Sequence, residues 1–256
     1  MKNLLKIFGL LCLLSHFSFA SAQSTLADFN VPPESTIPEG ALGIAIKQGK
    51  KLMNDTQRLL PKNVGNGLNC SSCHLSGGTV PKTAPFVGLW GVFPEFNARD
   101  AKVVTLSQRI NDCFERSMNG KPLAYNSDEM VNMLAYIQWL STGVPTGQSV
   151  KGRGFEAINP KLTSDRSRGQ ALYAQKCASC HGAEGAGLKL PTGSYVFPPL
   201  WGNESFNDGA GMTRTLTAAA FIRAKMPIGQ DNSLTEQEAM DIADFVVHQP
   251  RPAFKP

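Results

Sequence analysis

The chain has 256 residues, a length that fits one large domain or two of about 100 residues each. Hydrophobic residues make up 42% and charged residues 18%, which excludes a wholly disordered chain. Six cysteines are too few for a disulfide scaffold of this size. The net charge of +5, without a clustered basic stripe, does not indicate a nucleic-acid partner.

Residues 1–22 have the pattern of a cleavable secretory signal. Two lysines precede a short apolar run over residues 7–20, and Ala20-Ser21-Ala22 is a small-residue cleavage site. The alternative is an uncleaved membrane anchor, but the run is shorter than the roughly 20 residues that a spanning helix needs. We expect an exported, soluble mature chain. Loss of Cys12 and both lysines takes the cysteines from six to five and the charge from +5 to +3.

The rest of the chain contains one unit twice. Cys70-Ser71-Ser72-Cys73-His74 recurs as Cys177-Ala178-Ser179-Cys180-His181. A Pro-containing apolar stretch with the triplet Leu-Trp-Gly follows each copy, at 89–91 and 200–202. Helical patterns precede each motif and close each half, and there is almost no alternating strand pattern. The expected helices cover 39–55, 127–141, 165–177 and 235–248.

C-x-x-C-H is the attachment motif of c-type haem, in which both thiols add to porphyrin vinyl groups and the histidine binds iron. A zinc site would need more Cys or His pairs, of which only His248 remains, and a thioredoxin-like site would need a βαβ pattern. We therefore predict two covalently bound haem c groups. The predicted attachment cysteines are Cys70, Cys73, Cys177 and Cys180, and the proximal ligands are His74 and His181.

The expected fold is mainly α, with two c-type cytochrome domains in tandem that each wrap one haem. A Gly- and Pro-containing stretch without periodicity separates them. The expected boundaries are a signal peptide over 1–22, an N-terminal domain over 23–142, a linker over 143–164 and a C-terminal domain over 165–256. We expect Trp90 and Trp201 to pack against haem or core, and His248 to be a surface or capping residue.

The sixth ligand of the second iron should come from Lys225-Met226-Pro227, since Met226 stands 45 residues after His181. A methionine thioether in a Pro-containing loop is a common iron ligand. Met212 is the competing methionine, and a deprotonated Lys225 is the alternative ligand.

The first half offers two candidates, Met118 and Cys113. Equal spacing favours Met118, which stands 44 residues after His74. A thiolate of Cys113, stabilised by cations and iron, would instead lower the potential of the haem. From the residues alone both candidates remain open.

If residues 106–118 are helical, Arg109, Cys113 and Ser117 stand at i, i+4 and i+8, with Arg116 on the same stripe. That arrangement puts two guanidinium groups and a hydroxyl around one thiol. The alternative is a buried free cysteine among surface arginines.

The sequence resembles the dihaem thiosulfate dehydrogenases, which form tetrathionate. The stretch around Cys113 is the most discriminating, because ordinary electron-carrier cytochromes lack it. The matching stretches are 65–70, 84–88, 108–117, 133–136, 197–202 and 225–227.

The resemblance implies that Cys113 is the distal ligand of the first haem and that this haem is the active site. It also implies that Met226 or Lys225 caps the second haem, with exchange between redox states. The residues it assigns to the substrate pocket are Arg99, Arg109 and Ser117.

The implied reaction joins two thiosulfates to tetrathionate and passes two electrons through both haems to a small periplasmic cytochrome or copper protein. Arginines would hold the dianions, and Cys113 would leave iron to form a transient S-thiosulfonate. The reverse reaction would use the same site. The rival interpretations are a non-catalytic dihaem electron carrier and a haem subunit of a multi-protein sulfur-oxidising system.

Overall fold

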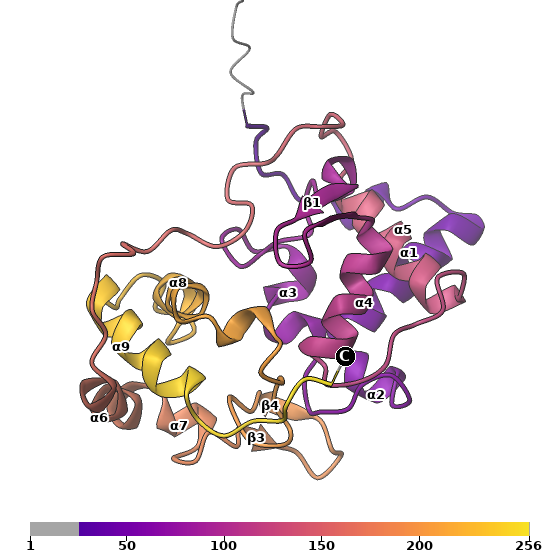
Figure 1. The fold of residues 1–256 in the computed structure, drawn as a ribbon. Coiled ribbons are helices and arrows are strands. Elements are labelled where there is room, and N and C mark those ends of the chain that lie inside the picture. The colour runs from indigo at the N-terminus through magenta and orange to yellow at the C-terminus, as the bar shows by residue number, and fades with distance from the viewer. Residues whose placement is uncertain (1–25, 256) are drawn as a thin grey trace, which may run out of the picture.

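The computed structural model describes residues 26–255, so the predicted signal segment, residues 1–22, lies outside the described part. Two helical units follow each other along the chain, and in Figure 1 they lie side by side. The first runs in indigo to magenta and the second in orange to yellow. The fold is mainly helical, as the sequence predicts.

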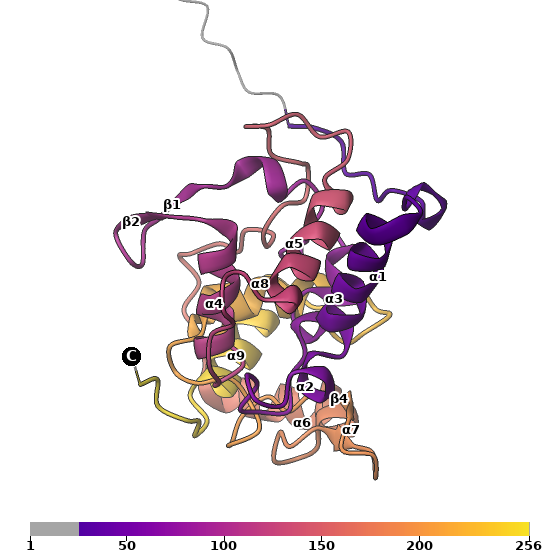
Figure 2. The ribbon, with the colours of Figure 1, turned by 90° about the vertical axis from the view of Figure 1, so that its right-hand side faces the viewer.

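The first unit contains five helices and a short two-stranded antiparallel ribbon. The ribbon pairs Phe96 with Val103 and projects from the helices (Figure 2). The elements are α1 Gly40–Asn54, α2 Thr56–Leu59, α3 Leu75–Gly78, β1 Glu95–Asn97, β2 Lys102–Val104, α4 Leu106–Arg116 and α5 Asp128–Leu140.

The second unit repeats this plan with four helices and a second ribbon. The elements are α6 Arg166–Lys176, α7 Ala178–His181, β3 Leu188–Lys189, β4 Tyr195–Phe197, α8 Thr215–Lys225 and α9 Glu236–Val247. Short 3-10 turns occupy Glu34–Thr36, Cys70–Ser72, Trp90–Val92 and Gly211–Thr213.

The four expected helices are confirmed, and local capping explains three of their starts. Ser127 accepts a hydrogen bond from the N–H of Met130, and Asp165 accepts one from the N–H of Arg168. Thr235 and Glu238 form a reciprocal capping box. These contacts involve residues three apart, which is why the sequence reveals them.

In each unit the first and last helices cross at a glycine. A Cβ on Gly49 of α1 would stand 2.0 Å from the carbonyl oxygen of Asn132 in α5. A Cβ on Gly169 of α6 would stand 2.0 Å from the carbonyl oxygen of Asp241 in α9. Only glycine allows these backbones to approach so closely, and the repeat therefore extends to the helix crossings.

Helix α4 ends at Arg116, two residues before the predicted end at 118. The N–H of Met118 bonds to the carbonyl of Cys113, and the N–H of Gly120 bonds to the carbonyl of Phe114. These bonds close the helix and turn the chain away, so that Met118 lies beyond the last helical turn.

Two buried asparagines join the end of α4 to the second unit. Asn207 donates from its side chain to the carbonyl of Glu115 at 2.8 Å and from its backbone to the carbonyl of Arg116 at 3.2 Å. Asn66 donates to the carbonyls of Ser117 and Ser205. The carbonyls of Glu115 and Arg116, at the end of α4, thus find donors in the second unit.

The predicted linker is paired with the first unit along part of its length. The N–H of Ala84 bonds to the carbonyl of Gly154 at 2.7 Å, and Thr83 forms an antiparallel bridge with Phe155. Ala27 bonds to Ser149 and Lys151 on the other side. The linker is therefore part of the wall of the first unit.

Candidate haem sites

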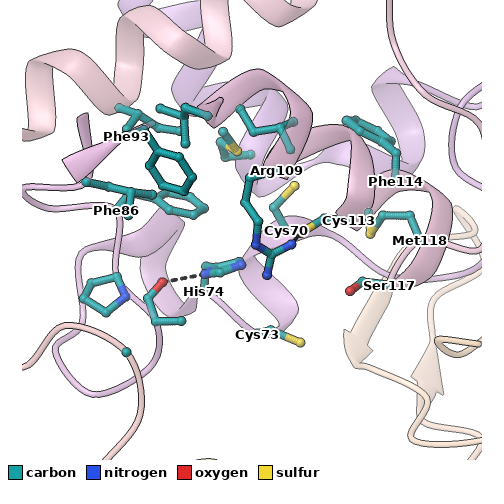
Figure 3. A pocket seen from close by; sticks show the side chains of 18 of the residues that line it. Cys70, Cys73, His74, Phe86, Phe93, Arg109, Cys113, Phe114, Ser117 and Met118 are labelled. Carbon is teal, nitrogen blue, oxygen red and sulfur yellow. Dashed lines mark hydrogen bonds between the residues drawn. The ribbon is translucent and has the colours of Figure 1, made fainter. Parts of the chain in front are cut away.

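The first C-x-x-C-H motif and α4 face each other across one cavity (Figure 3). Cys70, Cys73 and His74 line one side, and Arg109 and Cys113 line the other. The remaining lining is mainly apolar and includes Phe86, Phe93, Leu106 and Ile110.

The ring of His74 is held in one orientation by its backbone surroundings. Its Nδ1 lies 2.6 Å from the carbonyl oxygen of Ala84, a partner that can only accept, so Nδ1 carries the proton. The Nε2 lone pair is left available to a metal. Burial lowers the pKa of His74 to about 4, which keeps the imidazole neutral at pH 7.

Burial disfavours the thiolate forms of the two motif cysteines beside His74. Burial raises the pKa of Cys70 to about 11 and that of Cys73 to about 12. The five cysteines within the described residues form no disulfides. Two thiols, a neutral imidazole and an apolar cavity fit a covalently attached haem.

The opposite wall presents a cysteine with a cation against it. Nη1 of Arg109 donates to Sγ of Cys113 at 3.0 Å, one helical turn apart on α4. The negative charge of a Cys113 thiolate raises the pKa of Arg109. Ser117 lines the cavity one turn further along. The predicted i, i+4, i+8 stripe brings these three residues together.

Both candidate ligands of the first iron line the same cavity. Met118 is 3% exposed and packs with the core of the first unit. Cys113 has the guanidinium of Arg109 at its sulfur, an arrangement that stabilises a thiolate. The two sulfurs thus differ in their surroundings, since Cys113 has a cation at its sulfur and Met118 lies in the apolar core.

Arg116 does not join this cluster, contrary to the expectation of two guanidinium groups around the thiol. Its guanidinium lies 3.6 Å from the carboxylate of Asp100 and 4.2 Å from the ring centroid of Phe254. The Arg116 side chain is thus directed to the β1–β2 turn, which holds Asp100, and to the C-terminal segment, which holds Phe254.

Arg99 lies in the turn between β1 and β2, and it is not among the residues that line the cavity. Its Nη1 donates to the carbonyl of Gly209, in the second unit, at 3.3 Å. The structure thus places Arg109 and Ser117 in the cavity and Arg99 outside it.

The second motif lies at a second cavity of similar construction. Cys177, Cys180 and His181 line it together with Met226. Nδ1 of His181 lies 2.9 Å from the carbonyl oxygen of Pro198, and burial lowers the pKa of this histidine. Burial raises the pKa of Cys177 to about 11. The residues fit a second haem for the same reasons as the first.

Met226 and its competitor Met212 both line the second cavity, whereas Lys225 does not. The ammonium group of Lys225 pairs with Asp231. Of the two candidate iron ligands in the Lys-Met-Pro loop, Met226 is therefore the one that lines the cavity in this conformation.

The two tryptophans of the repeat differ. Trp201 packs against Tyr173 and Phe245, as expected. Trp90 is 41% exposed and lines neither cavity, so the expectation that it packs against haem or core is wrong. The neighbouring Leu89 packs against the core of the first unit instead. Trp90 is the first residue of a 3-10 turn, and its backbone N–H donates to the hydroxyl of Ser141. His248 caps α9 at the surface, as expected.

The two cavities share part of their walls. Leu68, Asn69 and Cys73 line both of them. The first attachment motif is thus the partition between the two sites.

Sequence reasoning missed an ion pair in the first cavity. Arg153, from the predicted linker, donates to Glu95 at 2.7 Å, and both residues line the cavity. No local pattern around Arg153 identifies it, because it arrives there through the backbone pairing of the linker with residues 82–84.

Two family profiles match the chain, one for each unit. The profile described as SoxA/TsdA, cytochrome c domain, matches residues 60–146. The profile described as cytochrome c oxidase, cbb3-type, subunit III, matches residues 164–246. The chain therefore has two tandem cytochrome c domains and, with them, two covalently attached haem c groups.

Individual relatives match across both units. Thiosulfate dehydrogenase of Allochromatium vinosum is 49% identical over 229 residues, which cover 88% of this chain and 85% of the relative. Thiosulfate dehydrogenase of Psychrobacter arcticus is 47% identical over 233 residues, 91% of this chain and 70% of that protein. The solved thiosulfate dehydrogenase (TsdBA) of Marichromatium purpuratum matches with a TM-score of 0.85 and 40% identity. That match covers 88% of this chain, which spans 50% of the longer solved chain.

Proposed function

This chain belongs to the thiosulfate dehydrogenase family, and we propose that it oxidatively couples two thiosulfates to tetrathionate at the cavity of Cys113. The observation that carries the proposal is the 3.0 Å contact between Arg109 and Cys113, opposite His74. A cysteine that only fills space needs no cation at its sulfur. A cysteine that reacts as a thiolate does.

When bound, the two haem c groups supply the iron that the thiolate ligates and take up one electron each. Among the residues of this chain, His74 and Cys113 would hold the first iron, and His181 and Met226 the second. Lys225 would need to break its pair with Asp231 before it could replace Met226.

The proposed reaction at Cys113 has two steps. The outer sulfur of one thiosulfate bonds to Sγ, two electrons leave, and a cysteine S-thiosulfonate forms. The outer sulfur of a second thiosulfate then attacks the sulfur that is bonded to Sγ. This attack forms the central S–S bond of tetrathionate and returns the cysteine as a thiolate. The same steps in reverse would reduce tetrathionate.

Arg109 and Ser117 position the substrate in this scheme. The guanidinium presents a planar fork of donors to the sulfonate oxygens, and the hydroxyl donates one further hydrogen bond. Two thiosulfate dianions repel each other at contact distance, so fixed positive charge beside Sγ lowers the barrier to the second attack.

The electrons leave through the second unit to a small soluble periplasmic cytochrome or similar one-electron acceptor. Transfer between the haems is supported by the wall that the cavities share at Cys73. The pattern of a cleavable signal over residues 1–22 supports the proposed periplasmic location. Within residues 26–255, no helix is long and apolar enough to span a membrane. N-terminal sequencing of the exported protein should begin at Gln23.

A steady-state assay of the isolated holoprotein with thiosulfate and ferricyanide tests the proposal. We expect turnover without any other protein. A non-catalytic carrier would show none, and a subunit of a multi-protein system would require its partner.

A matched pair of variants tests the role of the sulfur. Cys113→Gly should keep both haems attached and lose tetrathionate formation, whereas Met118→Leu should keep the turnover and the axial-ligand spectrum of the first haem. Normal turnover by Cys113→Gly, or loss of the first haem's ligand signature in Met118→Leu, would contradict the assignment.

A further inference from the structure

Two guanidinium groups from different units converge on one small space above Gly211. Nη2 of Arg214 lies 3.5 Å, and Nη2 of Arg99 lies 3.6 Å, from the point where a Cβ of Gly211 would stand. Arg99 comes from the turn between β1 and β2, and Arg214 is the residue that precedes α8. Because residue 211 is glycine, no side chain occupies this position next to the two guanidinium groups.

Neither guanidinium has a carboxylate partner within residues 26–255. Arg99 donates to the carbonyl of Gly209 at 3.3 Å, and Nε of Arg214 donates to the hydroxyl of Thr217 at 3.4 Å. Asp100, the acidic neighbour of Arg99, lies instead 3.6 Å from Arg116 and accepts a bond from Asn97. Two cations held together without a counter-ion repel, so the arrangement favours the binding of an anion.

Arg99 is also influenced by the charge of a residue in the cavity of Cys113. Partial burial lowers the pKa of Arg99, and the positive charges of Arg116, Arg214 and Arg109 lower it further. Arg109 is the residue whose guanidinium touches the sulfur of Cys113. Arg99 is therefore influenced by cations of the second unit and of the cavity.

We propose that Arg99 and Arg214 form an outer anion site that receives thiosulfate before it enters the cavity, with Arg214 as a substrate-binding residue supplied by the electron-transfer unit. The inference rests on the proposed function for the identity of the anion. A dianion with a tetrahedral sulfonate end suits two neighbouring guanidinium groups, because each can donate paired hydrogen bonds to an oxyanion.

The kinetic test compares Arg214→Gln with Arg166→Gln, a charge-matched control in the same unit that lies at the surface beside Asp244. The oxidant should be cationic, such as a cobalt(III) phenanthroline complex, because ferricyanide is an anion that could occupy the site. One charge-assisted hydrogen bond corresponds to about a tenfold change in affinity. We expect Arg214→Gln to raise KM for thiosulfate about tenfold, with kcat nearly unchanged, and Arg166→Gln to change neither. Arg214→Lys should restore part of the loss.

A second arm measures binding without turnover. Calorimetric titration of the oxidised holoprotein with inorganic sulfate, a redox-inert tetrahedral dianion, should show weaker binding in Arg214→Gln than in the wild type and in the control. If the wild type fails to oxidise thiosulfate, the proposed function fails, and the sulfate titration alone decides the anion site. Unchanged sulfate affinity in Arg214→Gln overturns the inference. A raised KM for a protein acceptor alone overturns it as well, because the pair would then bind that partner.

Discussion

Replacing Asn207 with alanine should destabilise the protein much more than an ordinary loss of surface hydrogen bonds. The side chain is 1% exposed. It donates to the carbonyl of Glu115 at 2.8 Å and to Oδ1 of Asn119 at 3.2 Å, and it accepts from the N–H of Gly209 at 3.1 Å. Alanine would remove these partners of the Glu115 carbonyl and the Gly209 N–H at a partly buried interface.

Each buried polar group left unsatisfied costs about 1–3 kcal/mol, so the two groups together predict a loss of about 3 kcal/mol in the free energy of unfolding. Asn63 provides the matched control, because its side chain also makes two hydrogen bonds, to the carbonyls of Lys121 and Pro122 at 3.2 and 3.1 Å. These bonds are exposed, so water replaces them in Asn63→Ala, and we expect a loss of less than about 1 kcal/mol.

Urea unfolding of the holoprotein, followed by circular dichroism and by haem absorbance, measures both losses. The N207A variant should unfold at lower urea, and the haem absorbance should respond, because Asn207 holds the helix that carries Cys113. Equal losses for N207A and N63A would refute the reasoning, since they would mean that the bonds between the units are not buried in solution.

Three further predictions concern substitutions of single residues. Gly49→Ala should cost more than about 2 kcal/mol in unfolding free energy, measured by urea titration, because its Cβ would meet the backbone of Asn132 at 2.0 Å. Burial raises the pKa of Asp241, but hydrogen bonds from Arg168 and two other donors outweigh burial and hold the pKa below 3.8. The stability that this carboxylate contributes is therefore present above pH 3.8 and is lost as the pH falls through the lower folded-state pKa. Asp241→Asn should flatten the acid limb of a plot of unfolding free energy against pH. An unchanged acid limb would contradict this prediction. Met226→Leu should lower the reduction potential of the second haem in a spectroscopic redox titration, with the first haem unaffected, because the thioether raises that potential.

The features that the sequence predicts well are those with a local cause. Helix starts at Ser127 and Thr235 follow from capping contacts three residues long. The contact of Arg109 with Cys113 follows from the spacing of one helical turn. The two haem motifs are likewise contiguous in the chain, so the number of haems needs no knowledge of tertiary structure.

The features that the sequence does not predict depend on segments that meet only in the folded chain. Arg153 reaches the first cavity because the linker pairs with residues 82–84. Arg214 meets Arg99 because the second unit packs against the β1–β2 turn. Trp90 is a case in which the sequence predicts too much. Trp90 and Trp201 occupy the same place in the repeated Leu-Trp-Gly triplet, which suggests equal burial, but the side chain of Trp90 is exposed.

The shared wall at Cys73 has a consequence for any attempt to divide this protein. The linker connects the two haem domains in the chain, and part of it is hydrogen-bonded to the first domain. Residues 68, 69 and 73 of the first domain line both cavities. Cutting the chain at the linker would therefore open the second cavity and strip donors from the end of α4. We therefore expect the second haem to need both domains for an intact binding cavity, and a change at Cys73 to affect the surroundings of both haems.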